Sequence, residues 1–295
     1  MRSGGVAGRL LAAGIALVAC RAQGRELPSS TAIVLESGTS TSAVVERPDA
    51  GAVATADPSS RPVAADWCID GLTPLDDETC YVLADATLRR PAVLLVYLHG
   101  IVPPVAESEQ KSRVELAVVH AAKRAGAAAL VPRGLRGIGP TGAHDWWAWP
   151  TDASSHAKYA PRLVAKWADA RRRLEAIAGS PFARTYLAGS SNGAYFLTAL
   201  ALSGDLDRLG FPVDGYAAIS GGSVGGHVRS SLPAPRPFYV GYGAYDASTN
   251  ASSRALGAFL GRAGWPTRIS ELPVGHGARE EYLDEAFAFW ASEAR

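Results

Sequence analysis

A serine flanked by two glycines carries the strongest chemical signal in the sequence. Segment 186–196 reads YLAGSSNGAYF, in which Gly189, Ser191 and Gly193 form a G-x-S-x-G pattern between an apolar run and an alanine-rich run. A serine on so sharp a strand-to-helix turn is held in a strained conformation, and small residues two positions away let the chain turn that tightly. Ser191 rather than Ser190 is therefore the candidate nucleophile, because a register shifted back by one residue would put an asparagine where glycine is needed. Without the flanking strand and helix, an ordinary glycine-rich turn would be the alternative.

Two further residues could activate that hydroxyl. A serine hydroxyl is a poor nucleophile until a neighbouring base takes its proton, and the base needs an acid that fixes its tautomer. Downstream, the run FYVGYGAYD ends at Asp246, and the later run ISELPVGHG carries His276 near its end. Taken singly, such an aspartate is typical of a helix N-cap and such a histidine of a loop. Taken together, in this order and each just past a predicted strand, they indicate the acid and the base of a triad with Ser191.

Two backbone amides are the predicted donors to the oxyanion of such a reaction. The run VLLVYLHG leads through Gly100 to Ile101, and the glycine lets the backbone turn into the site. The oxyanion would receive the N–H of Ile101 and the N–H of Asn192 at the start of the following helix. His99 is an alternative base, but a histidine in this place more often braces the loop by hydrogen bonding.

A tryptophan-rich segment lies between the third strand region and the long helix. It reads GLRGIGPTGAHDWWAWPTD and contains Trp146, Trp147 and Trp149. These indoles could wall an acyl or aromatic pocket, or they could pin the loop to the core, and the sequence leaves both interpretations open. His144 and Asp145 do not follow a predicted strand, so we expect a surface-loop role for both, without a metal.

Composition excludes several classes of protein. The 295 residues are 47% hydrophobic and 19% charged, which excludes a chain that is disordered or coiled-coil throughout. The net charge of +1 gives no reason to expect a nucleic-acid partner. The glycine-rich segment SGGSVGGH lacks the GK[ST] of a phosphate-binding loop. We expect no cofactor and no metal, and the oligomeric state is left open.

The N-terminus has the pattern of an export signal. Arg2 and Arg9 precede an apolar run over 10–19, which is shorter than the roughly 20 residues that a membrane-spanning helix needs. A secretory signal fits this length and these flanks. The residues LVAC, ending at Cys20, resemble the lipobox of bacterial lipoproteins, in which the cysteine is lipidated and becomes the new N-terminus. Arg21 in place of an aspartate favours the outer membrane, and an ordinary cleaved signal is the alternative.

The rest of the chain divides into a tether and one domain. We predict a signal peptide over 1–19, a flexible tether rich in Ser, Thr, Ala, Pro and Gly over 20–64, and a catalytic domain over 65–295. Three cysteines in an exported protein leave one unpaired, and lipidation would use Cys20. Cys68 and Cys80 bracket a short loop that a disulfide could close. Metal binding by this pair is the weaker alternative, since no CxxC spacing accompanies it.

Apolar strand patterns alternate with runs of helical spacing after residue 67. Continuous apolar strands belong in a sheet covered on both faces, and this alternation implies parallel pairing. The fold class is therefore predicted to be α/β, with three layers and a mostly parallel central sheet. Strands are predicted over 80–84, 92–98, 127–131, 185–188, 215–219, 238–242 and 267–272, and helices over 114–125, 159–178, 194–202, 252–263 and 279–291.

These motifs together resemble those of the α/β-hydrolase superfamily. The resemblance covers the chain from Tyr81 to the C-terminus and rests on strand-HG, G-x-S-x-G, strand-D and strand-HG in that order. Within the superfamily, LHG with GSSNGAY is similar to secreted single-domain esterases, including polyhydroxyalkanoate depolymerases, feruloyl esterases and dienelactone-hydrolase relatives. The resemblance implies an α/β-hydrolase fold and a serine esterase that forms an acyl-enzyme.

The predicted function is that of an exported, lipid-anchored serine hydrolase acting on a small or polymeric carboxylic ester. Its partners would be that ester and, through lipid on Cys20, a membrane of the bacterial cell envelope. One alternative is a serine peptidase or amidase with the same triad. The other is a non-catalytic member of the fold that binds at the cell surface, although such a module has no need for Ser191, Asp246 and His276 together.

Overall fold

Strands and helices alternate along the part of the chain that the computed structural model describes, residues 68–84, 92–105, 108, 110–225 and 231–294. The strands are β1 (Thr73–Asp76), β2 (Thr79–Val82), β3 (Val93–Leu98), β4 (Ala128–Pro132), β5 (Arg184–Ser190), β6 (Gly215–Ile219), β7 (Phe238–Gly243) and β8 (Thr267–Leu272). The helices are the π-helix η3 (Gln110–Glu115), α1 (Leu116–Arg124), α2 (Ala153–Ala178), α3 (Asn192–Ser203), α4 (Asp205–Arg208), α5 (Asn250–Arg262) and α6 (Glu280–Glu293).

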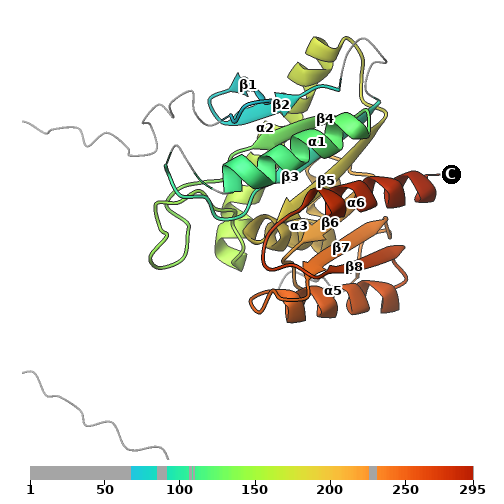
Figure 1. Ribbon diagram of the computed structural model, residues 1–295. Coiled ribbons are helices and arrows are strands. Elements are labelled where there is room, and N and C mark those ends of the chain that lie inside the picture. Colours follow the sequence, from blue (N-terminus) through green and yellow to red (C-terminus); the bar gives the residue numbers. More distant parts are fainter. Residues whose placement is uncertain (1–67, 85–91, 106–107, 109, 226–230, 295) are drawn as a thin grey trace, which may run out of the picture. The chain divides into compact units, whose positions relative to one another are not determined.

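All eight strands form one sheet in the order β1-β2-β4-β3-β5-β6-β7-β8 (Figure 1). Each pair of neighbours in the series β4-β3-β5-β6-β7-β8 is parallel, whereas β2 pairs antiparallel with both β1 and β4. The carboxyl ends of the parallel strands therefore meet at one edge of the sheet, and the loops that follow them are brought together there. We call this side of the sheet, where the parallel strands end, the carboxyl edge.

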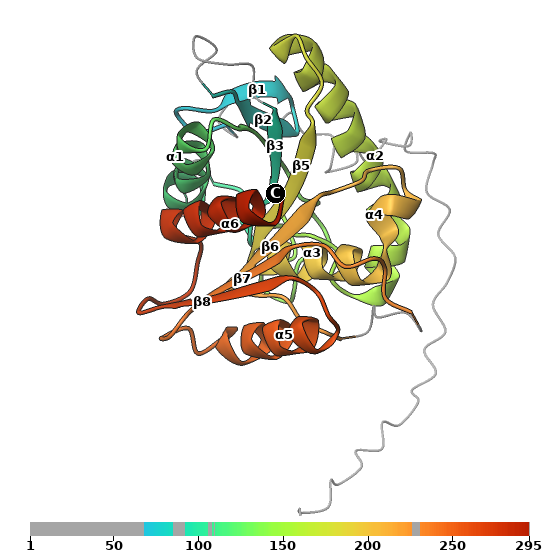
Figure 2. The same ribbon diagram turned by 90° about the vertical axis from the view of Figure 1, so that its right-hand side faces the viewer.

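Helices cover both faces of the sheet and complete three layers. Figure 2 shows α1 and α6 on one side and α2 and α3 on the other. Successive residues of a strand point to opposite faces, so Leu94 of β3 belongs to the core cluster that includes residues of α2, α3 and α5, whereas Leu95 belongs to the cluster that includes residues of α1 and α6. Strands buried on both faces read as continuous apolar runs, which is the pattern that VLLVYL shows in β3.

Every strand and helix predicted from the sequence is present, with shifts at the ends. The largest shift is in α2, which begins at Ala153 and not at 159. Asp152 caps this helix, because its side chain accepts hydrogen bonds from the N–H groups of Ser154 and Ser155. The polar first turns carry no apolar periodicity and were missed for that reason. β1, α4 and η3 are too short to show a period in the sequence and were not predicted.

A disulfide between Cys68 and Cys80 confirms the predicted pairing. It attaches the segment before β1 to β2, and Cys80 is fully buried. The predicted signal peptide, the predicted tether and Cys20 lie outside the described residues. In the described part of the chain, no helix combines the length and the apolar character that crossing a bilayer demands.

Candidate functional site

The sequence-predicted site residues follow the carboxyl ends of five different strands. Ile101 lies in the loop after β3, and the tryptophan-rich segment follows β4. Ser191 follows β5, Asp246 follows β7 and His276 follows β8. Because β3 to β8 run parallel, these segments all lie at the carboxyl edge. Along the chain, Ile101 and His276 are 175 positions apart (101 to 276).

Ser191 turns the chain between β5 and α3 in a strained conformation. Its φ is 51° and its ψ is −120°, and a positive φ is costly for a residue with a Cβ. The turn is tight because an added Cβ at Gly189 would lie 2.8 Å from the backbone of Gly193, and one at Gly193 would lie 2.2 Å from the carbonyl oxygen of Leu98. The two glycines are therefore needed where the G-x-S-x-G pattern has them.

The neighbouring Ser190 has a different environment from Ser191. Ser190 is buried, and its hydroxyl accepts a hydrogen bond of 2.7 Å from the phenol of buried Tyr97. Ser191 is partly exposed, at the start of α3. Of the two adjacent serines, Ser191 is therefore the more exposed.

Asp246 and His276 are joined by a hydrogen bond at the carboxyl edge. The Nδ1 of His276 lies 2.8 Å from the Oδ2 of Asp246. The carboxylate is buried, and the imidazole is exposed. The structure therefore brings together the two residues predicted to be the acid and the base.

The carboxylate of Asp246 is held as an anion by several donors. Its Oδ1 accepts from the N–H of Ser248 (3.0 Å), the hydroxyl of Ser248 (2.6 Å) and the N–H of Thr249 (3.1 Å). Its Oδ2 accepts from the hydroxyl of Thr249 and from His276. Burial alone raises the pKa of a carboxyl group, but these hydrogen bonds outweigh it and hold the pKa of Asp246 well below its usual value.

Ser220, directly after β6, is hydrogen-bonded to the loop that carries His276. Ser220 is fully buried and has a φ of 48°. Its hydroxyl donates to the carbonyl of Gly277 (3.0 Å) and accepts from the N–H of Gly277 (3.2 Å). The preceding residue, Ile219, accepts the N–H of Ser191 over 2.9 Å. The turn at Ser191 and the loop that carries His276 are thus bonded to consecutive residues at the end of β6.

His99 is a buried brace, which is the role expected of it in preference to that of a base. Its Nε2 accepts the N–H of Gly134 over 2.9 Å, so Nδ1 carries the proton and donates to the carbonyl of Gly100. The pKa of His99 is lowered to about 4, mainly by burial and to a lesser extent by the nearby charge of Arg133. The hydrogen bond to Gly100 raises it, but not enough to offset burial. Both ring nitrogens are engaged, and the ring stays neutral at physiological pH.

Trp149 links the start of α3 to the end of β3. Its backbone N–H donates to the side-chain Oδ1 of Asn192 over 2.6 Å. Its indole N–H donates to the carbonyl of His99 over 2.8 Å. The backbone N–H of Asn192 belongs to the first turn of α3, where amides have no partner within the helix. This N–H and the loop at Ile101 therefore lie on the two segments that Trp149 joins.

The tryptophan-rich segment is mostly pinned to the core. Trp149 is buried and stacks on Phe196 of α3, with ring centroids 5.8 Å apart. Trp147 is buried as well, and its backbone exchanges hydrogen bonds with Val102. Trp146 alone of the three is exposed. Of the two interpretations left open by the sequence, anchoring describes Trp147 and Trp149, and only Trp146 faces solvent. His144 and Asp145 are exposed in a loop, as expected.

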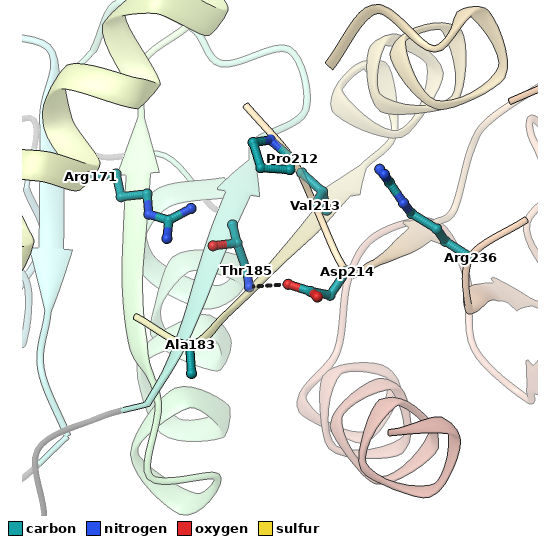
Figure 3. Close-up of a pocket in the computed structure, with 7 residues that line it drawn as sticks. All are labelled: Arg171, Ala183, Thr185, Pro212, Val213, Asp214 and Arg236. Atoms are coloured by element: carbon teal, nitrogen blue, oxygen red, sulfur yellow. Dashed lines mark hydrogen bonds between the residues drawn. The ribbon is translucent and has the colours of Figure 1, made fainter. Parts of the chain in front are cut away.

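A polar hollow lies at the opposite edge of the sheet, where β5 and β6 begin (Figure 3). Arg171 and Arg236 line it, with Thr185 and Asp214 between them. Each guanidinium is bound to a neighbouring carboxylate, and Asp214 accepts the N–H of Thr185 over 2.7 Å. The charged side chains that line this hollow are thus paired within the chain. None of the site residues predicted from the sequence lines the hollow. Within the described residues, no three His, Cys, Asp or Glu side chains gather as metal ligands would.

Several residues at the carboxyl edge were not singled out by the sequence analysis. Ser248 and Thr249 could have been found, because Asp-x-Ser-Thr is typical of a turn in which the aspartate accepts the following amides. The side chain of Asn192 and the hydroxyl of Ser220 have no such local signal. Their partners, Trp149 and Gly277, are distant in sequence.

Comparisons with known proteins show the fold of the chain. No protein-family model and no curated protein matches it. A carboxylesterase from Mesorhizobium loti is 21% identical with a TM-score of 0.50, over 75% of this chain and 99% of that one. YahD, solved with malic acid, is 16% identical with a TM-score of 0.53, over 74% and 99%. A variant of SOBER1 from Arabidopsis thaliana is 19% identical with a TM-score of 0.50, over 68% and 100%.

These structures share the arrangement described above, a mostly parallel sheet between two layers of helices. At identities of 16 to 21%, the likeness concerns the fold and not the substrate. The fold predicted from the sequence is confirmed: the chain has the α/β-hydrolase fold.

Proposed function

We propose that the protein is a serine hydrolase that cleaves carboxylic esters through an acyl-enzyme. The observation that carries the proposal is the joint arrangement at the carboxyl edge, with Ser191 on a strained turn, Asp246 hydrogen-bonded to His276, and the loop that carries His276 bonded to Ser220 at the end of the neighbouring strand β6. The carboxylesterase from Mesorhizobium loti, which has the same fold, supports an ester as the substrate class.

Each residue has a defined part in the proposed reaction. His276 takes the proton of Ser191 through Nε2 while the serine oxygen attacks the ester carbonyl, and Asp246 stabilises the imidazolium that forms. The N–H groups of Ile101 and Asn192 hold the negative oxygen of the tetrahedral intermediate. The imidazolium then gives its proton to the leaving alkoxide oxygen as the carbon–oxygen bond breaks. Water repeats the sequence on the acyl-enzyme and releases the acid.

The test compares two adjacent serines. We expect the wild-type protein to hydrolyse a short-chain p-nitrophenyl ester and to be labelled by a fluorophosphonate at Ser191, as located by peptide mass spectrometry. Ser191→Ala should lose both, by a factor of about 10⁴ or more in kcat. Ser190→Ala should keep the label. Undiminished turnover by folded Ser191→Ala would refute the proposal.

The same experiment separates the proposal from the two alternatives of the sequence analysis. Turnover of matched anilides at the rate of the esters would indicate an amidase. A wild-type protein that takes no label and turns over no ester would favour a binding module of this fold. The residues at the carboxyl edge favour catalysis, because binding gives no physical reason for both a strained Ser191 and an ionised Asp246 that is hydrogen-bonded to His276.

The proposal includes export and a lipid anchor on Cys20, with a membrane of the cell envelope as partner. Its support is the N-terminal pattern and the Cys68–Cys80 disulfide, since disulfides persist in oxidising compartments. Mass spectrometry of the mature protein should find a diacylated cysteine at its N-terminus. Cys20→Ser should move the protein out of the membrane fraction while leaving ester turnover unchanged. An unmodified Cys20 in the mature chain would remove the anchor from the proposal.

A further inference from the structure

The two proposed oxyanion donors come from separate loops that no strand pairing holds together. Pairing between β3 and β5 ends at Leu98 and Gly189, before either donor is reached. Ile101 lies three residues beyond the end of β3, and Asn192 begins α3. Two amides stabilise one oxyanion only when both are aimed at the same point, within a few tenths of an ångström. Another contact must therefore set their relative position.

One residue from a third loop contacts both segments. Trp149 donates its backbone N–H to the carboxamide of Asn192 over 2.6 Å and its indole N–H to the carbonyl of His99 over 2.8 Å. Trp149 is 1% exposed, stacks on Phe196 and meets the edge of Trp167 with ring centroids 5.8 Å apart. A side chain so enclosed has little freedom to move, so its two donors hold the two segments at a set distance.

His99 secures the first segment from its other side. Its Nε2 accepts from Gly134, and its Nδ1 donates to Gly100, the residue just before Ile101. The low pKa of His99 preserves this pattern of donor and acceptor, because a protonated ring could no longer accept from Gly134. The loop that leads to Ile101 is thus held by three hydrogen bonds. They join the His99 carbonyl to Trp149, the Gly100 carbonyl to the His99 ring, and that ring to Gly134.

We propose that Trp149 and the carboxamide of Asn192 are positioning residues of the oxyanion hole, which rests on the proposed function. They act through the backbone amides and need not touch the substrate. Their loss should weaken binding of the tetrahedral state and leave binding of the ground-state ester nearly unchanged.

Trp149→Phe is the sharpest test, because it removes the indole donor and keeps an aromatic ring against Phe196. The carbonyl of His99 would lose that donor, and the two segments would be free to shift. We expect kcat for a p-nitrophenyl ester to fall by about 10- to 100-fold, since a displacement of about 1 Å can cost that much. KM should stay within about twofold. Affinity for an alkyl boronic acid, which forms a tetrahedral adduct with the serine, should fall by the same factor as kcat.

Trp265→Phe is the matched control. It makes the same reduction in the same hydrophobic core, where Trp265 packs against Tyr216 and Phe238. This variant should differ from wild type in stability only, with kcat and boronate affinity within about twofold. Asn192→Ala is a second variant that keeps the backbone N–H and removes the acceptor of Trp149. It should reproduce the Trp149→Phe pattern, including the unchanged KM.

The outcomes separate this inference from the proposed function. A wild-type protein without ester turnover or fluorophosphonate labelling would overturn both. If the wild type is active and Trp149→Phe and Asn192→Ala match Trp265→Phe in kcat and boronate affinity, the positioning role is refuted and the proposed function stands. A rise in KM without a fall in kcat would also refute it, since that result would place Trp149 in ground-state binding.

Discussion

The Nδ1 of His276 lies 2.8 Å from the Oδ2 of Asp246, and the two side chains differ greatly in exposure, 43% for the histidine and 1% for the aspartate. The hydrogen bonds to Asp246 keep its pKa low, so the carboxylate is ionised and can only accept. Nδ1 must therefore carry the proton, which leaves the lone pair on Nε2. This tautomer is the one that a base acting on a serine hydroxyl requires.

Asp246→Asn should disable that arrangement without unfolding the protein. An asparagine amide can donate to Nδ1 and so favours the tautomer with the proton on Nε2, which cannot accept from serine. We expect kcat for ester hydrolysis to fall by roughly 10⁴-fold, measured alongside the circular dichroism spectrum. Asp145→Asn, on an exposed loop, is the control and should retain wild-type kcat. A loss of less than about tenfold in Asp246→Asn would contradict the assignment of the acid.

Ser220→Ala should loosen the loop that carries His276. The variant loses both hydrogen bonds between the serine hydroxyl and Gly277. One hydrogen bond of this kind is worth about 1 kcal/mol, so we expect kcat to fall by about fivefold to tenfold with KM unchanged. Ser203→Ala also removes a hydroxyl that donates to a backbone carbonyl, at the far end of α3, and should leave kcat as it is. Equal kinetics in the two variants would mean that Ser220 does not position the histidine.

Glu115 should make the stability of the protein fall as the pH rises. Its side chain is buried where η3 meets α1, and among the described residues neither carboxyl oxygen has a hydrogen-bond partner. Burial raises the pKa of Glu115 from 4.5 to about 8, partly offset by the charge of Lys111. Between these two pH values the folded protein binds more protons than the unfolded chain, so the free energy of unfolding decreases with pH across that window and levels off above it.

Glu115→Gln removes this dependence and provides the measurement. Urea unfolding should be measured at pH 5, 6, 7 and 8. At each step to higher pH, the free energy of unfolding of the variant should increase relative to that of the wild type, by a total on the order of a few kcal/mol. Most of the gain should be reached by pH 8. Parallel stability profiles for the two proteins would show that Glu115 titrates normally, and the buried site would need another explanation.

The disulfide should contribute to stability but not to activity. Closing a loop of this size contributes roughly 2 to 3 kcal/mol, so a reducing agent should lower the urea midpoint of the wild type. The double variant Cys68→Ser/Cys80→Ala should start from the lower midpoint and be insensitive to the reductant. Ester turnover should be equal in both, because β1 and β2 lie at the other end of the sheet from β7 and β8. A drop in kcat on reduction would contradict this separation.

Local pattern was sufficient for every strand except β1 and for the order of the candidate site residues along the chain. The apolar run of β3 and the glycines around Ser191 are informative because their causes, burial on both faces and a tight turn, act over a few residues. Asp246 and His276 could be paired from their order and their place after strands, since parallel strands bring such positions to one edge.

Contacts between distant segments were decided by tertiary packing alone. Nothing near Trp149 in the sequence shows that its indole reaches His99, or that Asn192 accepts its N–H. The turn of Ser220 and the burial of Glu115 are likewise set by how loops and helices pack around the sheet. Such contacts depend on the three-dimensional distance between residues far apart along the chain, and a local pattern holds no information about that distance.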